Sequence, residues 1–137
     1  MDCIFCKIVA GEIPAHNVYE DDATLAFLDI NPASRGHTLV ISKEHAPDLL
    51  TLSADSARAA ITTTQVVARI LHKVLQPDGF NIVQNNGPAS GQVVMHYHVH
   101  IIPRWNGDQV LRMWRPGETD HAALSELAAT LRAAEGT

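Results

Sequence analysis

The chain has 137 residues, of which 46% are hydrophobic, and this length and composition are typical of one globular domain with its own core. A formal net charge of −5 argues against binding of long nucleic acid, which needs a basic stripe, but it does not exclude one small nucleotide. The apolar runs are too short to span a membrane and no signal peptide is evident, so we expect a cytoplasmic protein without a membrane partner.

The order of the predicted elements favours an α+β fold. Apolar runs and turn residues predict strands at 16–20, 24–28, 38–41, 80–83 and 95–102. A long helix begins after Ser53 and ends at residues 77–79, and a second helix begins at about Asp120. Strands grouped around one long helix predict a mostly antiparallel sheet of about five strands. Because no repeat or linker interrupts the chain, we assign residues 1–112 to one domain and residues 113–137, with the short helix, to a tail of that domain.

Three histidines, His96, His98 and His100, alternate along the last predicted strand. Side chains alternate across a strand, so the three imidazoles share one face and the apolar residues between them face the core. The outer two Cα atoms lie roughly 13 Å apart, which would strain a metal site shared by all three, so we interpret the row as a division of labour. A solvated strand face and a surface metal scavenger are the alternatives. The preceding polar loop, residues 85–92, argues against them because its glycines can bring backbone N–H groups close to an anion.

Cys3 and Cys6 are the two cysteines of the chain, too few and too close together for a disulfide framework. A redox pair is one interpretation, but the expected setting of a strand followed by Cys-x-x-Cys and a helix is lacking. Two small residues without special chemistry are another. A tetrahedral zinc site is the third, and it needs two further sulfur or nitrogen ligands.

The segment GQVVMHYHVHII, residues 91–102, resembles the His-φ-His-φ-His-φ-φ motif of the histidine triad (HIT) superfamily, in which φ is apolar. Four further segments match: CIFCKI at 3–8, LDI at 28–30, GHTLVI at 36–41 and KEH at 43–45. Together they are similar to the Hint-like branch of the superfamily from about residue 3 to residue 103. The resemblance implies that residues 1–112 form a HIT domain.

The resemblance also implies nucleotidyl transfer at an α-phosphate. In this family the middle histidine, here His98, attacks phosphorus, and water then releases the nucleotidyl group. Neutral imidazole is abundant at pH 7 because its reference pKa is about 6.5. His100 would contact phosphate oxygens or protonate the leaving group, a task that suits a donor with a pKa near neutrality. His37 lies near the triad in this family and would orient its neighbours; packing beneath the sheet is the alternative.

The phosphate donors implied by the resemblance are Asn85 and the backbone of Gly91, Gln92 and Val93. Val93 stands where the family often has a serine. The missing hydroxyl leaves the preference for a leaving group open.

The remaining parts of a nucleotide site are a ribose contact and a base slot. Asp29 fits the two ribose hydroxyls, with a turn-forming aspartate as the alternative. Ile30, with Phe5, Ile8 and Phe27, is expected to form an apolar slot for a purine nucleotide such as AMP or GMP. Core packing explains Phe5, Ile8 and Phe27 equally well.

Bacterial-type HIT proteins and the related galactose-1-phosphate uridylyltransferases combine Cys-x-x-Cys with two histidines. Transferred to this chain, the resemblance implies Cys3, Cys6, His45 and His96 as ligands of zinc. Four filled positions imply a closed, structural site that holds no catalytic water. His96 would then serve the metal, and His98 would stay free to react.

The segment MWRPG, residues 113–117, resembles the Trp-containing C-terminal segment of Hint-like proteins, which in dimers reaches the neighbouring active site. The resemblance therefore implies a homodimer. In this chain the segment lies further from the triad and a helix follows it. Trp114 would contact a leaving group or lie buried under that helix.

The leading interpretation is a nucleotide hydrolase or transferase that acts on nucleoside phosphoramidates, nucleotidyl-amino-acyl compounds or dinucleoside polyphosphates. The alternative is not an enzyme but a nucleotide-binding or partner-binding module whose catalysis is vestigial. A zinc hydrolase with metal-bound water would lose activity with its metal and tolerate loss of His98. A processor of single-stranded nucleic-acid ends, like aprataxin, is disfavoured by the acidic balance.

Overall fold

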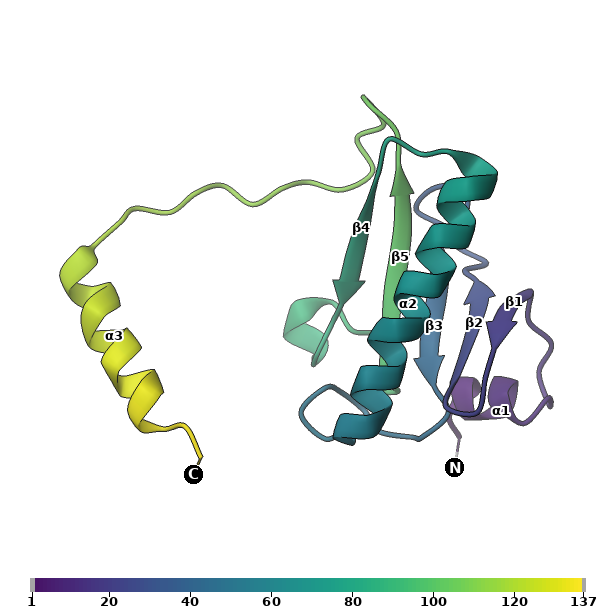
Figure 1. Ribbon diagram of the computed structural model, residues 1–137, viewed down its shortest axis with the longest axis horizontal. Helices are drawn as coiled ribbons and strands as arrows, with labels where there is room; N and C mark the ends of the chain where they lie inside the picture. The colour runs from purple at the N-terminus through teal and green to yellow at the C-terminus, as the bar shows by residue number, and fades with distance from the viewer. Residues whose placement is uncertain (1, 137) are drawn as a thin grey trace.

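The computed structural model describes residues 2–136; Met1 and Thr137, which the domain assignment included, lie outside them. Its centre is a five-stranded sheet in the order β1-β2-β3-β5-β4, and every neighbouring pair of strands is antiparallel (Figure 1). The strands are β1 (Asn17–Glu20), β2 (Thr24–Leu28), β3 (Thr38–Ser42), β4 (Gly79–Gln84) and β5 (His98–Arg104). The predicted α+β class, with a mostly antiparallel sheet of about five strands, is confirmed.

The long helix α2 (Ala54–Leu75) crosses one face of the sheet (Figure 1). The Ser53 hydroxyl accepts a hydrogen bond from the Ser56 N–H at 3.2 Å, which caps the helix at its predicted start. The helix ends where Gln76 adopts a left-handed conformation (φ 50°), directly before Pro77. Within residues 2–136, none of the helices is both long enough and apolar enough to cross a membrane.

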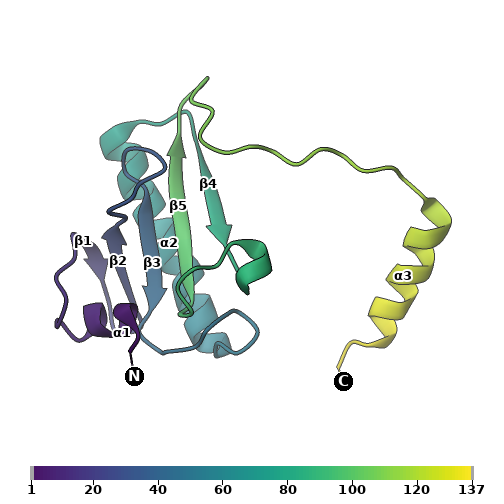
Figure 2. The ribbon, with the colours of Figure 1, turned by 180° about the vertical axis from the view of Figure 1, so that it is seen from behind.

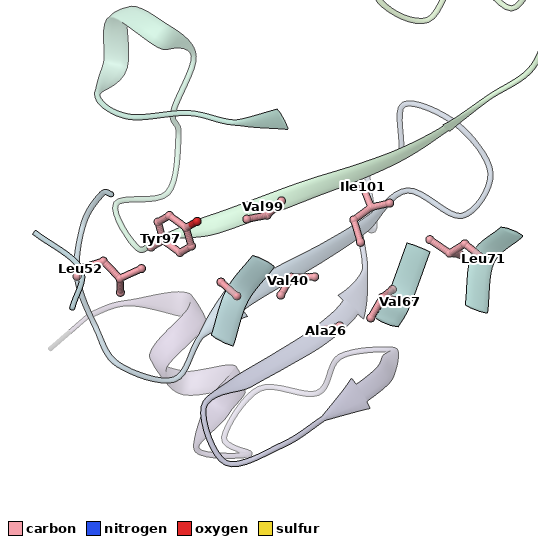
Figure 3. Packing of buried hydrophobic residues seen from close by; sticks show 10 residues of the cluster. Ala26, Val40, Leu52, Val67, Leu71, Tyr97, Val99 and Ile101 are labelled. Atoms are coloured by element: carbon pink, nitrogen blue, oxygen red, sulfur yellow. The ribbon is translucent and has the colours of Figure 1, made fainter. Parts of the chain in front are cut away.

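The main core lies between α2 and the sheet. Val40 of β3 and Ile101 of β5 face Val67 and Leu71 of α2 (Figure 3). Burying an apolar side chain of this size stabilises a fold by about 1.5–3 kcal/mol relative to leaving it exposed. Because side chains alternate along a strand, the packing of Ile101 toward α2 places His98 and His100 on the opposite face of the sheet.

The short helix α1 (Ile4–Val9) covers this opposite face, away from α2 (Figure 2). A second cluster of buried apolar residues joins it to the sheet and contains Phe5, Leu25, Phe27, Leu39 and Ile41. No sequence pattern predicted α1. The usual capping residues are missing, and the Cys3 thiol takes their place by accepting from the Cys6 N–H at 3.4 Å.

The alternating pattern predicted a strand that begins at residue 95, but strand β5 begins at His98. The Tyr97 N–H donates to the carbonyl of Ala46 at 2.8 Å, so the chain has left the regular ladder at this point. His96 therefore lies in the segment before β5. Tyr97 is still buried on the α2 side, so the predicted separation of apolar and histidine side chains holds.

The C-terminal part of the chain leaves the body formed by the sheet, α1 and α2. Residues 105–120 run without helix or strand to α3 (His121–Ala133), which stands apart from the sheet in both views (Figures 1 and 2). Asp120 caps α3 where a helix was predicted to begin. Trp114 is 80% exposed, so the alternative in which the last helix buries it is wrong.

Candidate active site

A backbone carbonyl determines which nitrogen of His98 is free. Its Nδ1 lies 2.7 Å from the carbonyl oxygen of His96. A carbonyl can only accept a hydrogen bond, so Nδ1 carries the proton and Nε2 keeps an unprotonated lone pair. That lone pair is the atom a nucleophilic histidine needs.

A chain of hydrogen bonds fixes His100 in the same way. The Ala33 N–H donates to Nδ1 of His37 at 2.9 Å, so the His37 proton is on Nε2. His37 Nε2 donates to Nδ1 of His100 at 2.9 Å, which leaves the His100 proton on Nε2. The His37 side chain is buried as well as hydrogen-bonded, so the two alternatives for it, orientation of a neighbour and packing, coexist.

Burial keeps the two imidazoles of β5 neutral. Desolvation lowers the pKa of His98, against smaller raising effects from its hydrogen bond to His96 and from the charge of Asp29. Burial, and then the neighbouring His98 and His37, lower the pKa of His100 to about 4. A donor with a pKa near neutrality was expected at His100, whereas the lowered pKa makes this imidazole a neutral N–H donor at pH 7. A phosphate bound beside it would raise its pKa again.

His98 and His100 line a pocket of about 450 Å³, a volume typical of small-molecule sites. The lining residues that the sequence analysis named are Phe5, Ile8, Phe27, Asp29, Ile30, Gly91, Val93, His98 and His100. It missed Ile4, Ile13, Leu39 and Val94, which also line the pocket. The spacing of Ile4 and Ile8, four residues apart, is a helical signal that would have placed both on one side of α1. The pocket therefore joins an apolar wall from α1 and β2 to polar groups of the triad.

Asp29 combines the two roles that the sequence left open. Its Oδ1 accepts from the Asn31 N–H at 2.8 Å, which closes the local turn. Its Oδ2 lies 3.6 Å from Nε2 of His37, and the residue lines the pocket beside the triad. A carboxylate at this place can hold the loop and still offer an acceptor to a ligand.

Asn85 and Gln92, two predicted nucleotide-binding residues, are not among the residues that line the pocket. Gln92 is buried: its Nε2 donates to the carbonyls of Pro47 (2.6 Å) and Val94 (3.0 Å), and its Oε1 accepts from the Gly87 N–H (2.7 Å). Its side chain thus holds the shape of the loop. Asn85 lies beside Gly91, with its amide nitrogen 3.6 Å from the position a Cβ would take there.

The four predicted metal ligands, Cys3, Cys6, His45 and His96, come together at the N-terminus of α1. Their ligand atoms all lie within 4.8 Å of one another. Cys3 Sγ is 3.3 Å from His96 Nδ1, Cys6 Sγ is 3.3 Å from His45 Nδ1, and the two Nδ1 atoms are 3.1 Å apart. Tetrahedral zinc, with bonds of about 2.3 Å to sulfur and 2.0–2.1 Å to nitrogen, places its ligand atoms about 3.4–3.8 Å apart. The separation of Cys6 Sγ from His96 Nδ1, 3.6 Å, falls in this range, and the three shorter ones are within about 0.3 Å of it. The cluster is consistent with a zinc site.

A second carbonyl prepares His96 for this role. His96 is fully buried, and its Nε2 donates to the carbonyl oxygen of Ser42 at 2.6 Å. The lone pair of Nδ1 is therefore directed at the two thiols, as a metal-ligating imidazole requires. The sequence motifs do not identify Ser42, because its contribution is a backbone group.

An antiparallel sheet with His98 and His100 on β5, preceded by His96 beside a Cys-x-x-Cys cluster, has the features of a histidine triad protein. The HIT domain family matches residues 10–107, and the chain belongs to this family. Adenosine 5′-monophosphoramidase hnt1 of Schizosaccharomyces pombe is 44% identical over 116 residues, which are 85% of this chain and 84% of that protein.

Solved structures support the same assignment. A member of the HIT family from Bacillus subtilis superposes with a TM-score of 0.93 at 35% identity, and the match covers 100% of this chain and 99% of that one. A zinc-bound histidine triad family protein from Mycobacterium smegmatis has a TM-score of 0.77 at 40% identity, over 95% of this chain and 98% of that one.

Proposed function

We propose that this protein is a nucleoside phosphoramidase or nucleotidyl hydrolase that works through a nucleotidyl-His98 intermediate. The observation that carries the proposal is the free Nε2 of His98 in the pocket, with its Nδ1–H held by the His96 carbonyl at 2.7 Å. The S. pombe relative, whose name gives it the same kind of activity, supports this reaction class.

The proposed reaction has two displacements at the α-phosphate. His98 Nε2 forms a bond to phosphorus as the bond to the leaving group breaks, and an amine leaving group takes up a proton from solvent. The resulting imidazole ring is positively charged, and the Nδ1–H bond to the His96 carbonyl stabilises that charge. Water then attacks phosphorus, the P–Nε2 bond breaks, the water loses one proton to solvent, and the nucleoside monophosphate leaves with His98 neutral again.

His100 and His37 assist this reaction in different ways. His100 directs its Nε2–H as a donor, which suits a non-bridging phosphate oxygen or the leaving group. His37 touches His100 and not the reacting atoms, so it is a positioning residue. Val93 lines the same pocket and would offer its backbone N–H as a further donor, whereas the N–H groups of Gly91 and Gln92 already donate within the loop, to the carbonyls of Pro88 (3.0 Å) and Gly87 (3.3 Å).

A purine nucleotide such as AMP or GMP fits the rest of the pocket. Phe5, Ile8 and Phe27 provide an apolar slot for the base, and Ile30, 79% exposed, provides an apolar group at the rim. Asp29 provides the acceptor for ribose hydroxyls. Val93 is 87% exposed and lacks the hydroxyl of the family's usual serine, so no side-chain donor assists a leaving group there.

Hydrolysis of adenosine 5′-phosphoramidate at neutral pH tests the proposal. We expect release of AMP with first-order dependence on enzyme concentration. Nucleoside phosphoramidates with larger amines and dinucleoside polyphosphates, assayed in parallel, rank the leaving groups. Tight AMP binding without turnover of any of these substrates would contradict hydrolysis and favour a nucleotide-binding module.

The pH dependence of kcat/KM follows from the lowered pKa values. We expect a plateau through neutral pH and a decline only at a pH below the ordinary histidine value, where the nucleophile His98, whose pKa burial lowers, becomes protonated. The value of kcat/KM should fall on the acid side, because a histidine with a lowered pKa keeps its neutral form until the pH falls through the lowered value. Initial rates at low substrate concentration measure this profile. A midpoint near 6.5, the ordinary value, would contradict the geometry.

Zinc is the metal we propose for the Cys3–Cys6–His45–His96 cluster. Two thiolates and two imidazoles are a common ligand set of structural zinc. All four positions come from the protein, so these residues would clamp the N-terminus and α1 to the segment before β5. The metal would supply a cross-link between distant parts of the chain and no catalytic chemistry.

We also propose a homodimer in which α3 packs on a second copy. Leu124, Leu127 and Leu131 lie on one side of α3 and are each more than half exposed, and a helix of 13 residues is marginal in water unless it packs. Beside the edge strand β4, a groove is lined by Ile61, Thr62, Thr64, Gln65, Ala68 and Ile82. Residues 118–135 carry four acidic and one basic residue, whereas α2 carries three basic and one acidic residue, so the two surfaces are complementary in charge.

Sedimentation equilibrium tests this assembly. We expect the mass of two chains for the wild type and a shift toward one chain for Leu127→Glu, which places a charge in the apolar side of α3. Ala129→Glu, on the other side of the same helix, is the matched control and should stay dimeric. A Leu127→Glu protein that dimerises as tightly as the control would contradict the proposed packing.

A further inference from the structure

Helix α1 belongs to both the metal cluster and the nucleotide pocket. Cys3 caps its N-terminus and Cys6 lies in its first turn, so two of the four metal ligands hold this helix. Ile4, Phe5 and Ile8 of the same helix line the pocket. A helix of six residues has little stability of its own, so its position depends on what anchors it.

Phe5 connects the two sites through direct ring contacts. It lies between the two cysteines in sequence and is only 6% exposed. Its ring centroid lies 5.8 Å from that of His96, the metal ligand, and 5.1 Å from that of His98, the nucleophile. It also packs edge-on against Phe27 of β2 at 5.7 Å. Movement of α1 would therefore change the packing around His98 and the apolar wall of the pocket together.

His96 provides a second connection, through the backbone. Its ring points Nδ1 at the cysteines, with Nε2 bonded to Ser42, and its carbonyl oxygen accepts the Nδ1–H of His98. One residue thus contributes a ligand to the cluster and holds the tautomer of the nucleophile. Two independent physical links, one through Phe5 and one through His96, join the sites.

We propose that metal binding at the Cys3–Cys6–His45–His96 cluster and nucleotide binding in the pocket reinforce each other, with Phe5 as the positioning residue that couples them. The inference rests on the proposed nucleotide function and on metal occupancy of the cluster. When the ligands are filled, α1 is held against the sheet and the pocket wall is preformed. When they are empty, part of the nucleotide's binding energy is needed to order α1, and affinity falls.

Coupling of this kind is reciprocal, which gives two measurements of one quantity. Titration calorimetry compares the AMP affinity of the zinc-loaded protein with that of the chelator-treated protein, whose folding is checked by circular dichroism. We expect affinity to fall about tenfold without zinc. Competition with a chromophoric chelator measures zinc affinity with and without saturating AMP, and should show the same factor. This second arm needs no isolated metal-free protein.

Phe5→Leu separates the coupling from the metal site itself, because all four ligands remain. We expect stoichiometric zinc in this variant. The coupling factor, which is the ratio of AMP affinity with zinc to AMP affinity without it, should fall below about twofold because the ring contacts with His96 and His98 are lost. Val9→Ala, which removes apolar volume from α1 outside the pocket lining, is the control and should keep the full factor.

Each outcome decides a different part of the account. Equal AMP affinity with and without zinc, or a full coupling factor in Phe5→Leu, would overturn the inference and leave the proposed function intact. No AMP binding to the zinc-loaded wild type would overturn the proposed function as well. No stoichiometric zinc in the wild type would overturn the metal assignment and the coupling, and the proposed function would still be decided by hydrolysis of adenosine 5′-phosphoramidate.

Discussion

His98→Ala should lower the turnover of adenosine 5′-phosphoramidate by at least about 1,000-fold, because it removes the atom that forms the bond to phosphorus. AMP binding should survive. The substitution removes at most one neutral hydrogen bond to the nucleotide, so the dissociation constant of AMP should stay within about tenfold of the wild-type value. Steady-state kinetics and titration calorimetry on the same preparations measure the two effects.

The matched control for this substitution is His72→Ala, which removes an exposed imidazole from α2 and should leave turnover unchanged. If His98→Ala kept a tenth or more of the wild-type rate, His98 would not be the nucleophile. In that case a metal-bound water, the mechanism of a zinc hydrolase, becomes the candidate, and chelation should then abolish activity while sparing AMP binding.

Removal of the thiols should have the largest effect on stability. Cys3→Ser combined with Cys6→Ser deletes two of four ligands, so we expect loss of bound zinc and of about 4 kcal/mol of unfolding free energy, the contribution of a ligand present at about 1,000 times its dissociation constant. For a chain of this size, that lowers the melting temperature by about 14 °C. Elemental analysis and thermal unfolding measure the two losses.

A chelator supplies the control for the double substitution. It should destabilise the wild type by about as much as the two substitutions do, and it should have no further effect on the double variant. A wild-type melting temperature that does not respond to a strong chelator, in protein purified without one, would show that no structural metal is present.

The sheet and the long helix were predictable because their signals are local. Ser53 begins a run of helical periodicity that Pro77 ends, and each strand is a short apolar segment between turn residues. The convergence of Cys3, Cys6, His45 and His96 was predicted only through the family resemblance. No local rule brings residues together that are 93 positions apart in the chain.

The elements that the sequence analysis missed depend on tertiary contacts. Helix α1 lacks an ordinary capping residue, and the Cys3 thiol and the packing of Phe5 replace it. The start of β5 is displaced because the Tyr97 N–H pairs with Ala46 outside the sheet. Gln92 has no distinguishing pattern, and only the structure places its amide between Pro47 and Gly87.

For His98, a carbonyl that fixes the tautomer is what a nucleophilic imidazole requires, but the sequence could not identify which backbone groups fix the protonation of the histidines. Two carbonyls, of His96 and Ser42, and one N–H, of Ala33, decide which nitrogen carries the proton on His98, His96 and His37. These are backbone groups, so any residue type would supply them and no motif records them. The lowered pKa of His100 has a different origin, because it follows from burial and from neighbouring imidazoles, which the tertiary structure brings together.

The most direct test of the central claim is to trap the nucleotidyl-enzyme. The protein is mixed with adenosine 5′-phosphoramidate, quenched rapidly in denaturant at alkaline pH, because the P–N bond is acid-labile, and digested for mass spectrometry. The account predicts one adenylyl group on His98, formed and consumed at rates that match turnover and absent from His98→Ala. An adenylyl group on a different residue, or product release at full rate with no labelled protein at any time, would contradict it.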